Sequence, residues 1–124
     1  MLSGQLLPIR PYAFRAEMPT QNVKPASQTE MDQCVALIVL AFSSDPAARW
    51  AYPDPPNFLE YFPRFVRAFG GKAFELGSAH YIERSAAALW LPPGTQPDEE
   101  ALVTLIRDSV PALIKTRCLR CLNR

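Results

Sequence analysis

The stretch from residue 43 to residue 56 reads SSDPAARWAYPDPP and places rigid, charged and aromatic residues in one connection. Its four prolines fix their own backbone angles and restrict the residues before them. Among them stand Asp45, Arg49, Trp50 and Tyr52. Asp45 or Arg49 can set the charge of a bound molecule, and the two rings supply flat apolar contact. The stretch therefore predicts a preformed loop that forms the wall of a binding site, with these four residues as candidate substrate-binding residues.

A second group of reactive side chains is the C-x-x-C pair of Cys118 and Cys121. As half of a zinc site it needs two more ligands, and the remaining candidates are His80 and Cys34, of which Cys34 is expected in a buried helix. A redox C-x-x-C normally opens a helix after a strand, whereas this pair lies in the last residues of the sequence. We therefore expect incidental thiols and no metal site.

The acidic residues give no catalytic assignment. Glu83 falls at a predicted turn, and the run from Asp98 to Glu100 suits the positive end of a helix dipole. No G-x-S-x-G serine signature occurs in the sequence. His80 lies in a predicted strand without a mapped partner. The catalytic residues therefore stay unknown.

The elements that must position the candidate wall are predicted from periodicity and capping. A short strand is expected near residues 22–25, followed by a helix that ends near Phe42. Ser27 and Glu30 have the spacing of a capping box at the start of this helix. Apolar residues recur at helical intervals after it, which predicts a helix whose second half is buried on most sides.

A second helix is predicted after the candidate wall. Its apolar stripe predicts a core face and consists of Phe58, Phe62, Phe65, Val66, Phe69, Ala73 and Leu76. Asn57 is the expected cap, and Pro63 is expected to kink the first turns because it cannot donate a backbone hydrogen bond. Gly70 and Gly71 are expected inside this helix or at a break in it.

The segments AHYIE (residues 79–83) and AAALWLP (residues 86–92) predict an antiparallel hairpin that turns at Arg84-Ser85. The second strand is almost wholly apolar, which favours an interior position in a sheet. Another helix is expected over residues 97–110, with Pro97 in its first turn. The order strand, helix, helix, hairpin, helix predicts an α/β (α+β) fold.

The bulk composition places limits on the kind of protein. With 124 residues, 48% of them hydrophobic, the chain is expected to form one globular domain after an irregular leader at residues 1–17. A net charge of +1 gives the protein no overall electrostatic attraction to nucleic acid. No apolar run in the sequence is long enough to span a membrane. Because three cysteines make no disulfide framework, we expect a cytoplasmic protein.

The segments AFSSDPAARWAYPDPPNFLEYFPRFVRAFGGKAFE and AALWLPPGTQPDEEAL resemble the N-terminal half of bacterial N-acetyltransferases of the GNAT superfamily. The likeness covers about residues 18–111 and rests on the DPxxRWxYP and ALWLPPG motifs. It implies transfer of an acetyl group from acetyl-CoA to a small-molecule or peptide amine. It also implies that the first two helices and their connection form one wall of the acceptor site, which contains Asp45, Arg49, Trp50 and Tyr52.

The pyrophosphate-binding pattern of that superfamily, Gln/Arg-x-x-Gly-x-Gly/Ala, does not occur in the 124 residues. Such a loop uses backbone N–H groups at a helix N-terminus, which glycine lets the coenzyme approach closely. We therefore expect a partial GNAT-like fold without the central cofactor-binding strand and helix, and no acetyl-CoA binding by this chain alone. Residues 112–124, which hold four basic and no acidic residues, are expected to be a basic tail of a truncated or frame-shifted product.

Two functions of different classes remain open. One is an inactive fragment that carries the acceptor-side half of an N-acetyltransferase. The other is a small non-catalytic α/β module that binds another protein chain. In either case, the apolar strand that ends at Leu91 is expected to lack a neighbour on one side and to favour self-association through an exposed sheet edge. The basic tail alone makes a weak case for nucleic-acid binding.

Overall fold

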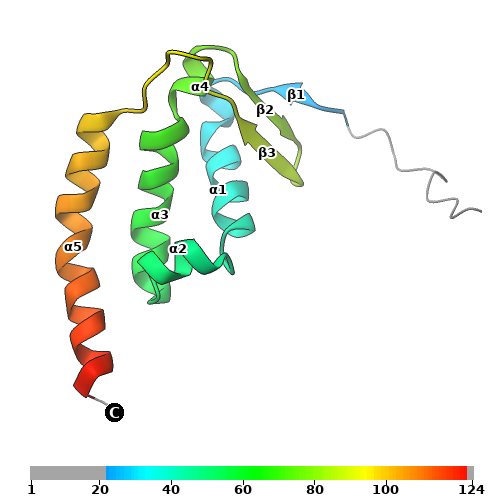
Figure 1. The fold of residues 1–124 in the computed structure, drawn as a ribbon. Coiled ribbons are helices and arrows are strands. Elements are labelled where there is room, and N and C mark those ends of the chain that lie inside the picture. Colours follow the sequence, from blue (N-terminus) through cyan, green and yellow to red (C-terminus); the bar gives the residue numbers. More distant parts are fainter. Residues whose placement is uncertain (1–21, 123–124) are drawn as a thin grey trace, which may run out of the picture.

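The computed structural model describes the backbone of residues 22–122 and the side chains of residues 22–111. The predicted leader at residues 1–17 lies outside this part. The elements follow in the order β1 (Lys24–Pro25), a 3-10 turn (Gln28–Glu30), α1 (Met31–Ala41), α2 (Pro46–Ala51), α3 (Pro55–Gly70), α4 (Lys72–Glu75), β2 (Ala79–Ile82), β3 (Ala86–Leu89) and α5 (Glu99–Leu122). Figure 1 shows a small sheet beside a layer of helices, so the predicted α+β class is confirmed.

The start of α1 is held by a local contact that the sequence predicts. The backbone N–H of Ser27 donates to the carboxylate of Glu30 over 2.7 Å, as expected for a capping box. The Ser27 hydroxyl also donates to this carboxylate, and the two bonds hold the pKa of Glu30 below its usual value. One turn later Cys34 and Val35 are buried, and burial raises the pKa of the Cys34 thiol.

The candidate wall is not a loop throughout, and this prediction was wrong. Residues Pro46–Ala51 form helix α2. Asp45 starts the helix, because its side-chain oxygen accepts a hydrogen bond from the backbone N–H of Ala48 over 2.9 Å. Pro46 follows at the first helical position, where its missing N–H costs nothing.

Helix α3 carries the predicted phenylalanine stripe, with two differences. The helix begins at Pro55 after Asp54, so the assignment of Asn57 as its cap was wrong. Phe58, Phe62 and Val66 are buried as predicted, but Phe65 and Phe69 are exposed. The rest of the stripe is interrupted as expected, because α3 ends at Gly70 and a new short helix begins at Lys72.

The sheet is antiparallel, with the strand order β1-β2-β3. The predicted hairpin is confirmed, with Ala79 opposite Leu89 and Ile82 opposite Ala86. Arg84 in the turn has a positive φ of 57°. In the part of the chain that the structure describes, β3 pairs only with β2. The apolar composition of β3 therefore does not place it inside the sheet, and β3 is an edge strand.

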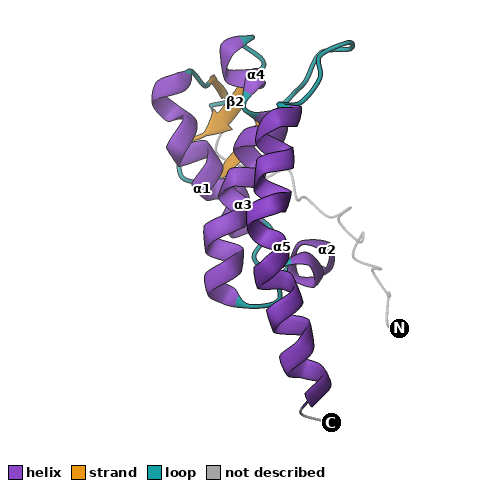
Figure 2. Cartoon of the chain, turned by 90° about the vertical axis from the view of Figure 1, so that its left-hand side faces the viewer, coloured by secondary structure: helices purple, strands orange, loops and turns teal. Residues whose placement is uncertain are grey.

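Helix α5 begins two residues later than the predicted Pro97. Asp98 caps it by accepting a hydrogen bond from the backbone N–H of Ala101 over 3.0 Å. The helix runs back along α3 in the opposite direction (Figures 1 and 2), and Arg64 binds Asp108 across the two helices at 2.7 Å. Its backbone continues through residues 112–122, the segment predicted as a basic tail, so this segment is helical.

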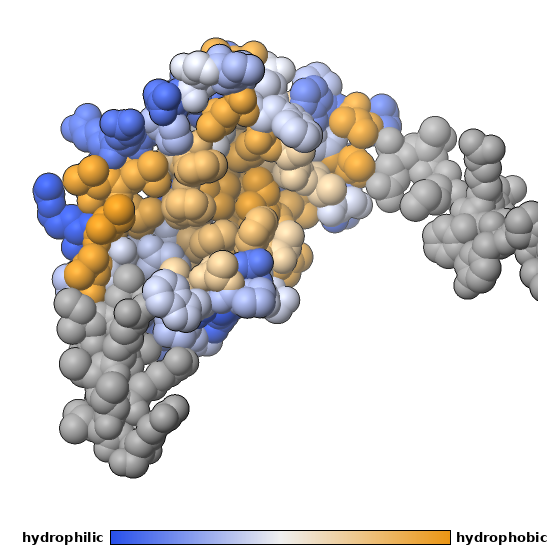
Figure 3. Space-filling model, in the orientation of Figure 1, coloured by the Kyte–Doolittle hydropathy of each residue, from blue (hydrophilic) through white to orange (hydrophobic). Residues whose placement is uncertain are grey.

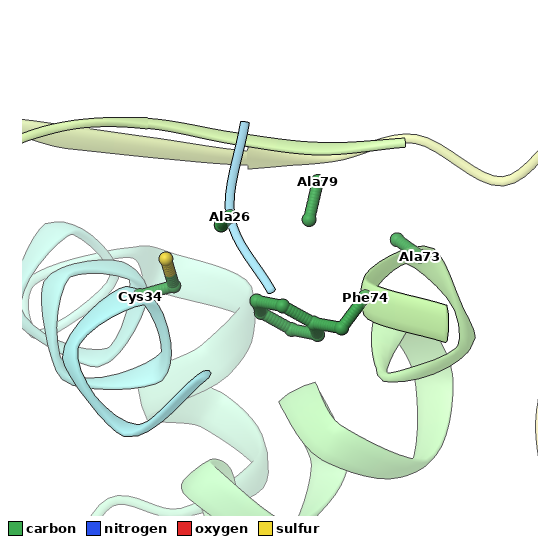
Figure 4. Close-up of a cluster of buried hydrophobic side chains, with 5 residues drawn as sticks. All are labelled: Ala26, Cys34, Ala73, Phe74 and Ala79. Carbon is green, nitrogen blue, oxygen red and sulfur yellow. The ribbon is translucent and has the colours of Figure 1, made fainter. Parts of the chain in front are cut away.

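Two small hydrophobic clusters form the core. The first lies between the sheet and helices α1 and α4 (Figure 4), and consists of Ala26, Cys34, Ala73, Phe74 and Ala79. The second lies between α1, α2 and α3, and consists of Val35, Ala48, Phe58, Phe62 and Val66. Met31 and Leu89 pack against both clusters and join them into one core.

Residues 22–122 contain no helix that combines the length and the apolar character needed to cross a membrane.

Candidate functional site

One face of the protein has an apolar hollow of about 960 Å³, which we call the groove. Helices α1, α2 and α3 and strand β3 surround it, and Figure 3 shows apolar residues gathered on this face with polar residues around them. The residues that line it include Ile38, Phe42, Asp45, Ala48, Tyr52, Phe62, Phe65, Phe69, Ala87, Leu89 and Leu91. Its volume is at the upper end of the range for ligand pockets, about 300–1,000 Å³.

A row of phenylalanine rings forms one side of the groove. The ring centroid of Phe65 lies 5.8 Å from that of Phe62 and 5.5 Å from that of Phe69. Phe42 of the connection after α1 joins the row, with its ring centroid 5.7 Å from that of Phe62. Phe42, Phe65 and Phe69 remain exposed although they gather on one surface. A gathered apolar surface of this kind is typical of a binding site.

Asp45 is the only carboxylic acid among the described residues that line the groove. Its position is fixed, because one carboxylate oxygen caps α2 through Ala48. It forms no ion pair with any residue in the described part of the chain. The groove therefore combines an aromatic wall with one fixed negative charge, which suits a cation with an apolar body.

Tyr52 lines the groove from the end of α2 and also connects α2 to α5. Its hydroxyl donates to the Ser109 hydroxyl over 3.3 Å, and its ring stacks on Tyr61 with the centroids 5.7 Å apart. Ser109 is a buried polar residue of α5. Tyr52 thus borders the groove, while its hydroxyl binds Ser109 of α5.

Arg49 and Trp50 are not among the residues that line the groove. The Arg49 guanidinium donates to the carbonyl of Pro53 over 2.8 Å and lies 5.2 Å from the centroid of the Phe58 ring. Trp50 is exposed on α2. The structure therefore brings Asp45 and Tyr52 of the four candidates together at one site, and it gives Arg49 a structural role.

Replacing Arg49 with alanine is expected to lower the free energy of unfolding by about 0.5–2 kcal/mol. The change removes the bond to Pro53 and the contact with the Phe58 ring. Urea unfolding monitored by circular dichroism measures the difference. Unchanged stability, combined with a loss of ligand binding, would contradict the structural role.

The other reactive residues whose side chains the structure describes do not form a second site. Glu83 lies 3.8 Å from the ammonium of Lys24, and His80 is half-buried in β2. Within the described residues, no group of three His, Cys, Asp or Glu side chains could hold a metal ion. The side chains of Cys118 and Cys121 lie outside the described part.

Comparison of the chain with protein-family models, with curated proteins and with solved structures found no match.

The sequence-based prediction missed the half of the groove that comes from α3 and β3. Phe65 and Phe69 were assigned to the core because they continue the same helical stripe as Phe62. Ala87 and Leu89 were seen only as strand residues. The available signal was the run of four phenylalanines along one helix, Phe58, Phe62, Phe65 and Phe69.

Proposed function

We propose that this chain carries the acceptor-side half of a GNAT-like N-acetyltransferase, in which an amine accepts an acetyl group from acetyl-CoA. Two features support the proposal. The first is the resemblance carried by the DPxxRWxYP and ALWLPPG motifs. The second is the groove, which lies against the helices and the connection that would form the acceptor wall. On this proposal the chain acts in the cytoplasm.

The observation that carries the proposal is that Asp45 lines the same groove as the row of phenylalanine rings. A primary amine is a cation at neutral pH, and a carboxylate within a few ångströms favours it. The rings of Phe65 and Phe69 would contact the apolar part of the same molecule. The acceptor class that fits best is therefore an amine with an aromatic or long apolar body.

The binding of 2-phenylethylamine to wild-type protein and to Asp45→Asn tests this acceptor class. Asparagine caps a helix about as well as aspartate does, so the variant removes the charge and keeps α2. We expect about tenfold weaker binding to the variant, which corresponds to about 1.4 kcal/mol. The neutral analogue 2-phenylethanol serves as the control and should bind both proteins equally. Equal amine affinity for the two proteins would contradict the assignment of Asp45.

The residues present do not fit the pyrophosphate of acetyl-CoA. The only paired glycines are Gly70 and Gly71, and a Cβ added at Gly70 would lie 2.7 Å from the Cδ1 atom of Leu89. Gly70 thus allows α3 to approach β3, and the helix after the pair, Lys72–Glu75, is a single turn. We therefore derive no step through the coenzyme. Calorimetry of this chain with acetyl-CoA should show no binding, and a micromolar dissociation constant would contradict this part of the proposal.

The second candidate function is a non-catalytic module that binds another protein chain. The edge position of β3 beside the groove favours it. The two candidates differ in what they bind. The acceptor-side half should select amines through Asp45, whereas the module should bind an extended or folded polypeptide with no need for an amine.

A further inference from the structure

The free edge of β3 carries backbone groups that point away from the sheet. The backbone N–H of Trp90 donates to the carbonyl of Ser78 over 3.1 Å, so Trp90 faces β2. In an antiparallel pair, successive residues turn their N–H and C=O groups to opposite sides. Ala88 therefore faces β2 as well, while Ala87 and Leu89 direct their backbone groups to the open edge.

The opposite strand gives an independent check of this alternation. Ala79 is the partner of Leu89 in the register. Its carbonyl accepts a hydrogen bond from the backbone N–H of Ala26 over 2.9 Å, on the β1 side of the sheet. Because Ala79 faces β1, it forms no pair of hydrogen bonds with Leu89. Leu89 must therefore face the side away from β2.

This edge lacks charged residues and proline, two of the features by which proteins prevent strand pairing, although β3 itself has only four residues. Edge strands are commonly protected by charged side chains, by proline or by a bulge. From Ala86 to Leu91 the chain has no charged residue and no proline. Within residues 22–122 no other strand pairs with this edge. No strand within residues 22–122 therefore pairs with the outward backbone groups of Ala87 and Leu89.

The groove lies directly beside the same edge, because Ala87, Leu89 and Leu91 belong to its lining. A strand added to β3 would extend the sheet over the groove. Its alternate side chains would then point toward the exposed rings of Phe65 and Phe69. The backbone edge and the apolar groove thus offer the two kinds of contact that one extended segment makes at once.

A second copy of this chain fits this surface less well than a single segment does. Antiparallel pairing of β3 with β3 of another copy, around a two-fold axis, would put the helices of both copies on the same face of the joined sheet. Because α3 borders the groove beside β3, the α3 helices of the two copies would then lie on one face next to the shared edge. A single extended segment brings no helix layer with it.

We propose that the β3 edge and the groove together bind an extended, uncharged, apolar-alternating segment of another polypeptide, which adds as a fourth strand beside β3. The segment spans about five residues, one opposite each position from Ala87 to Leu91. Its inward side chains are aliphatic and contact Phe65 and Phe69. The inference rests on the strand edge and does not depend on acyl transfer.

The probe for the test is the fluorescein-labelled peptide Lys-Val-Thr-Val-Thr-Val-Lys with an amidated C-terminus, whose valines share one face of a strand. Fluorescence anisotropy with the 124-residue chain should give a dissociation constant of roughly 1–100 μM. The same peptide with proline in place of the central valine should bind at least tenfold more weakly, because proline does not fit within a paired strand. Equal binding of the two peptides, or no binding of the first at about 1 mM protein, would overturn the proposal.

Two N-methylated peptides test the backbone pairing directly. In one, the amide nitrogens of the valines are methylated, and in the other, those of the threonines. The two sets lie on opposite edges of the peptide strand. One set must face β3, so one peptide should lose at least tenfold in affinity and the other should stay within about threefold. Equal affinities for the two would contradict strand addition.

Two substitutions on α3 test the groove. Phe69 and Leu59 are both exposed on this helix, but only Phe69 lines the groove. We expect Phe69→Glu to weaken peptide binding at least tenfold, because the charge would lie against the apolar face of the segment. Leu59→Glu is the matched control and should change the affinity less than twofold. Equal effects of the two would overturn the placement of the segment in the groove.

Sedimentation equilibrium distinguishes the second copy as occupant. A chain that stays monomeric at about 100 μM and binds the peptide supports the proposal. A dimer that Phe69→Glu dissociates, and that the peptide does not displace, would show that a second copy occupies the groove and would overturn it. The acceptor proposal fails on a different result, namely equal binding of 2-phenylethylamine to the wild-type protein and to Asp45→Asn.

Discussion

Phe58→Ala is expected to lower the free energy of unfolding by about 3–5 kcal/mol, the range for a buried phenylalanine. The Phe58 side chain is 2% exposed and lies in the cluster that joins α1, α2 and α3. Its ring stacks on that of Phe62 with the centroids 4.9 Å apart, and the Arg49 guanidinium also lies over the Phe58 ring. The truncation removes these contacts and leaves a cavity that the three helices cannot all close.

Urea unfolding monitored by circular dichroism at 222 nm measures this loss. The adjacent residue provides the control, because Leu59 is 64% exposed on the same helix. Leu59→Ala should change the stability by less than about 0.5 kcal/mol. Similar effects at the two positions would mean that α3 does not present the described face to α1 and α2.

Leu105→Ala is expected to lower the free energy of unfolding by about 2–5 kcal/mol, and it tests whether α5 packs against α3. Leu105 is 2% exposed although α5 follows a long connection after the sheet. The buried Ser109 one turn later receives the hydrogen bond from Tyr52. Loss of the Leu105 side chain should therefore loosen both α5 and the end of α2.

Ile106 is the matched control for this substitution, because it is the next residue on α5 and 59% exposed. Ile106→Ala should change the free energy of unfolding by less than about 0.5 kcal/mol. The exposed side chain loses little packing, and alanine is the better helix former. Hydrogen exchange of the α5 amides gives a second measure, since Leu105→Ala should lower their protection more than Ile106→Ala does. No difference between the two variants would show that α5 is not packed against α3 in solution.

The parts of the fold that depend on neighbouring residues were predictable from the sequence. The contact of Ser27 with Glu30, the turn at Arg84 and the break at Gly70 and Gly71 are set within a few residues of chain. Hydrophobic periodicity likewise identified Phe58 as a core residue. In each case the controlling interaction is short in sequence, so the residue types alone specify it.

The groove and the roles of its wall depend on residues that are distant in sequence. Phe58 and Phe65 belong to one helical stripe, and only the positions of α1, α2 and β3 decide that Phe58 is buried and Phe65 exposed. Arg49 was a candidate substrate-binding residue, and the sequence did not predict that its guanidinium binds the Pro53 carbonyl. Helix α2 itself is only six residues long, too short for a periodic signal.

The composition of β3 shows a further limit of sequence patterns. Its residues Ala86–Leu89 read as a buried central strand, yet in the described part of the chain the strand lies at the sheet edge. A further strand beside β3 would cover both this apolar strand and the apolar groove next to it. Hydrophobicity alone thus did not predict the edge position of β3, because that position depends on which strands pair with it.

The most direct test of the acceptor proposal is the site at which 2-phenylethylamine binds, measured by amide chemical-shift changes in ¹⁵N-labelled protein. The account predicts the largest changes at Ile38, Asp45 and Leu89, which border the groove from α1, α2 and β3. The amides around Arg64 and Thr104, in the smaller hollow between α3 and α5, should stay unchanged. Saturable changes in that hollow, with none in the groove, would contradict the account.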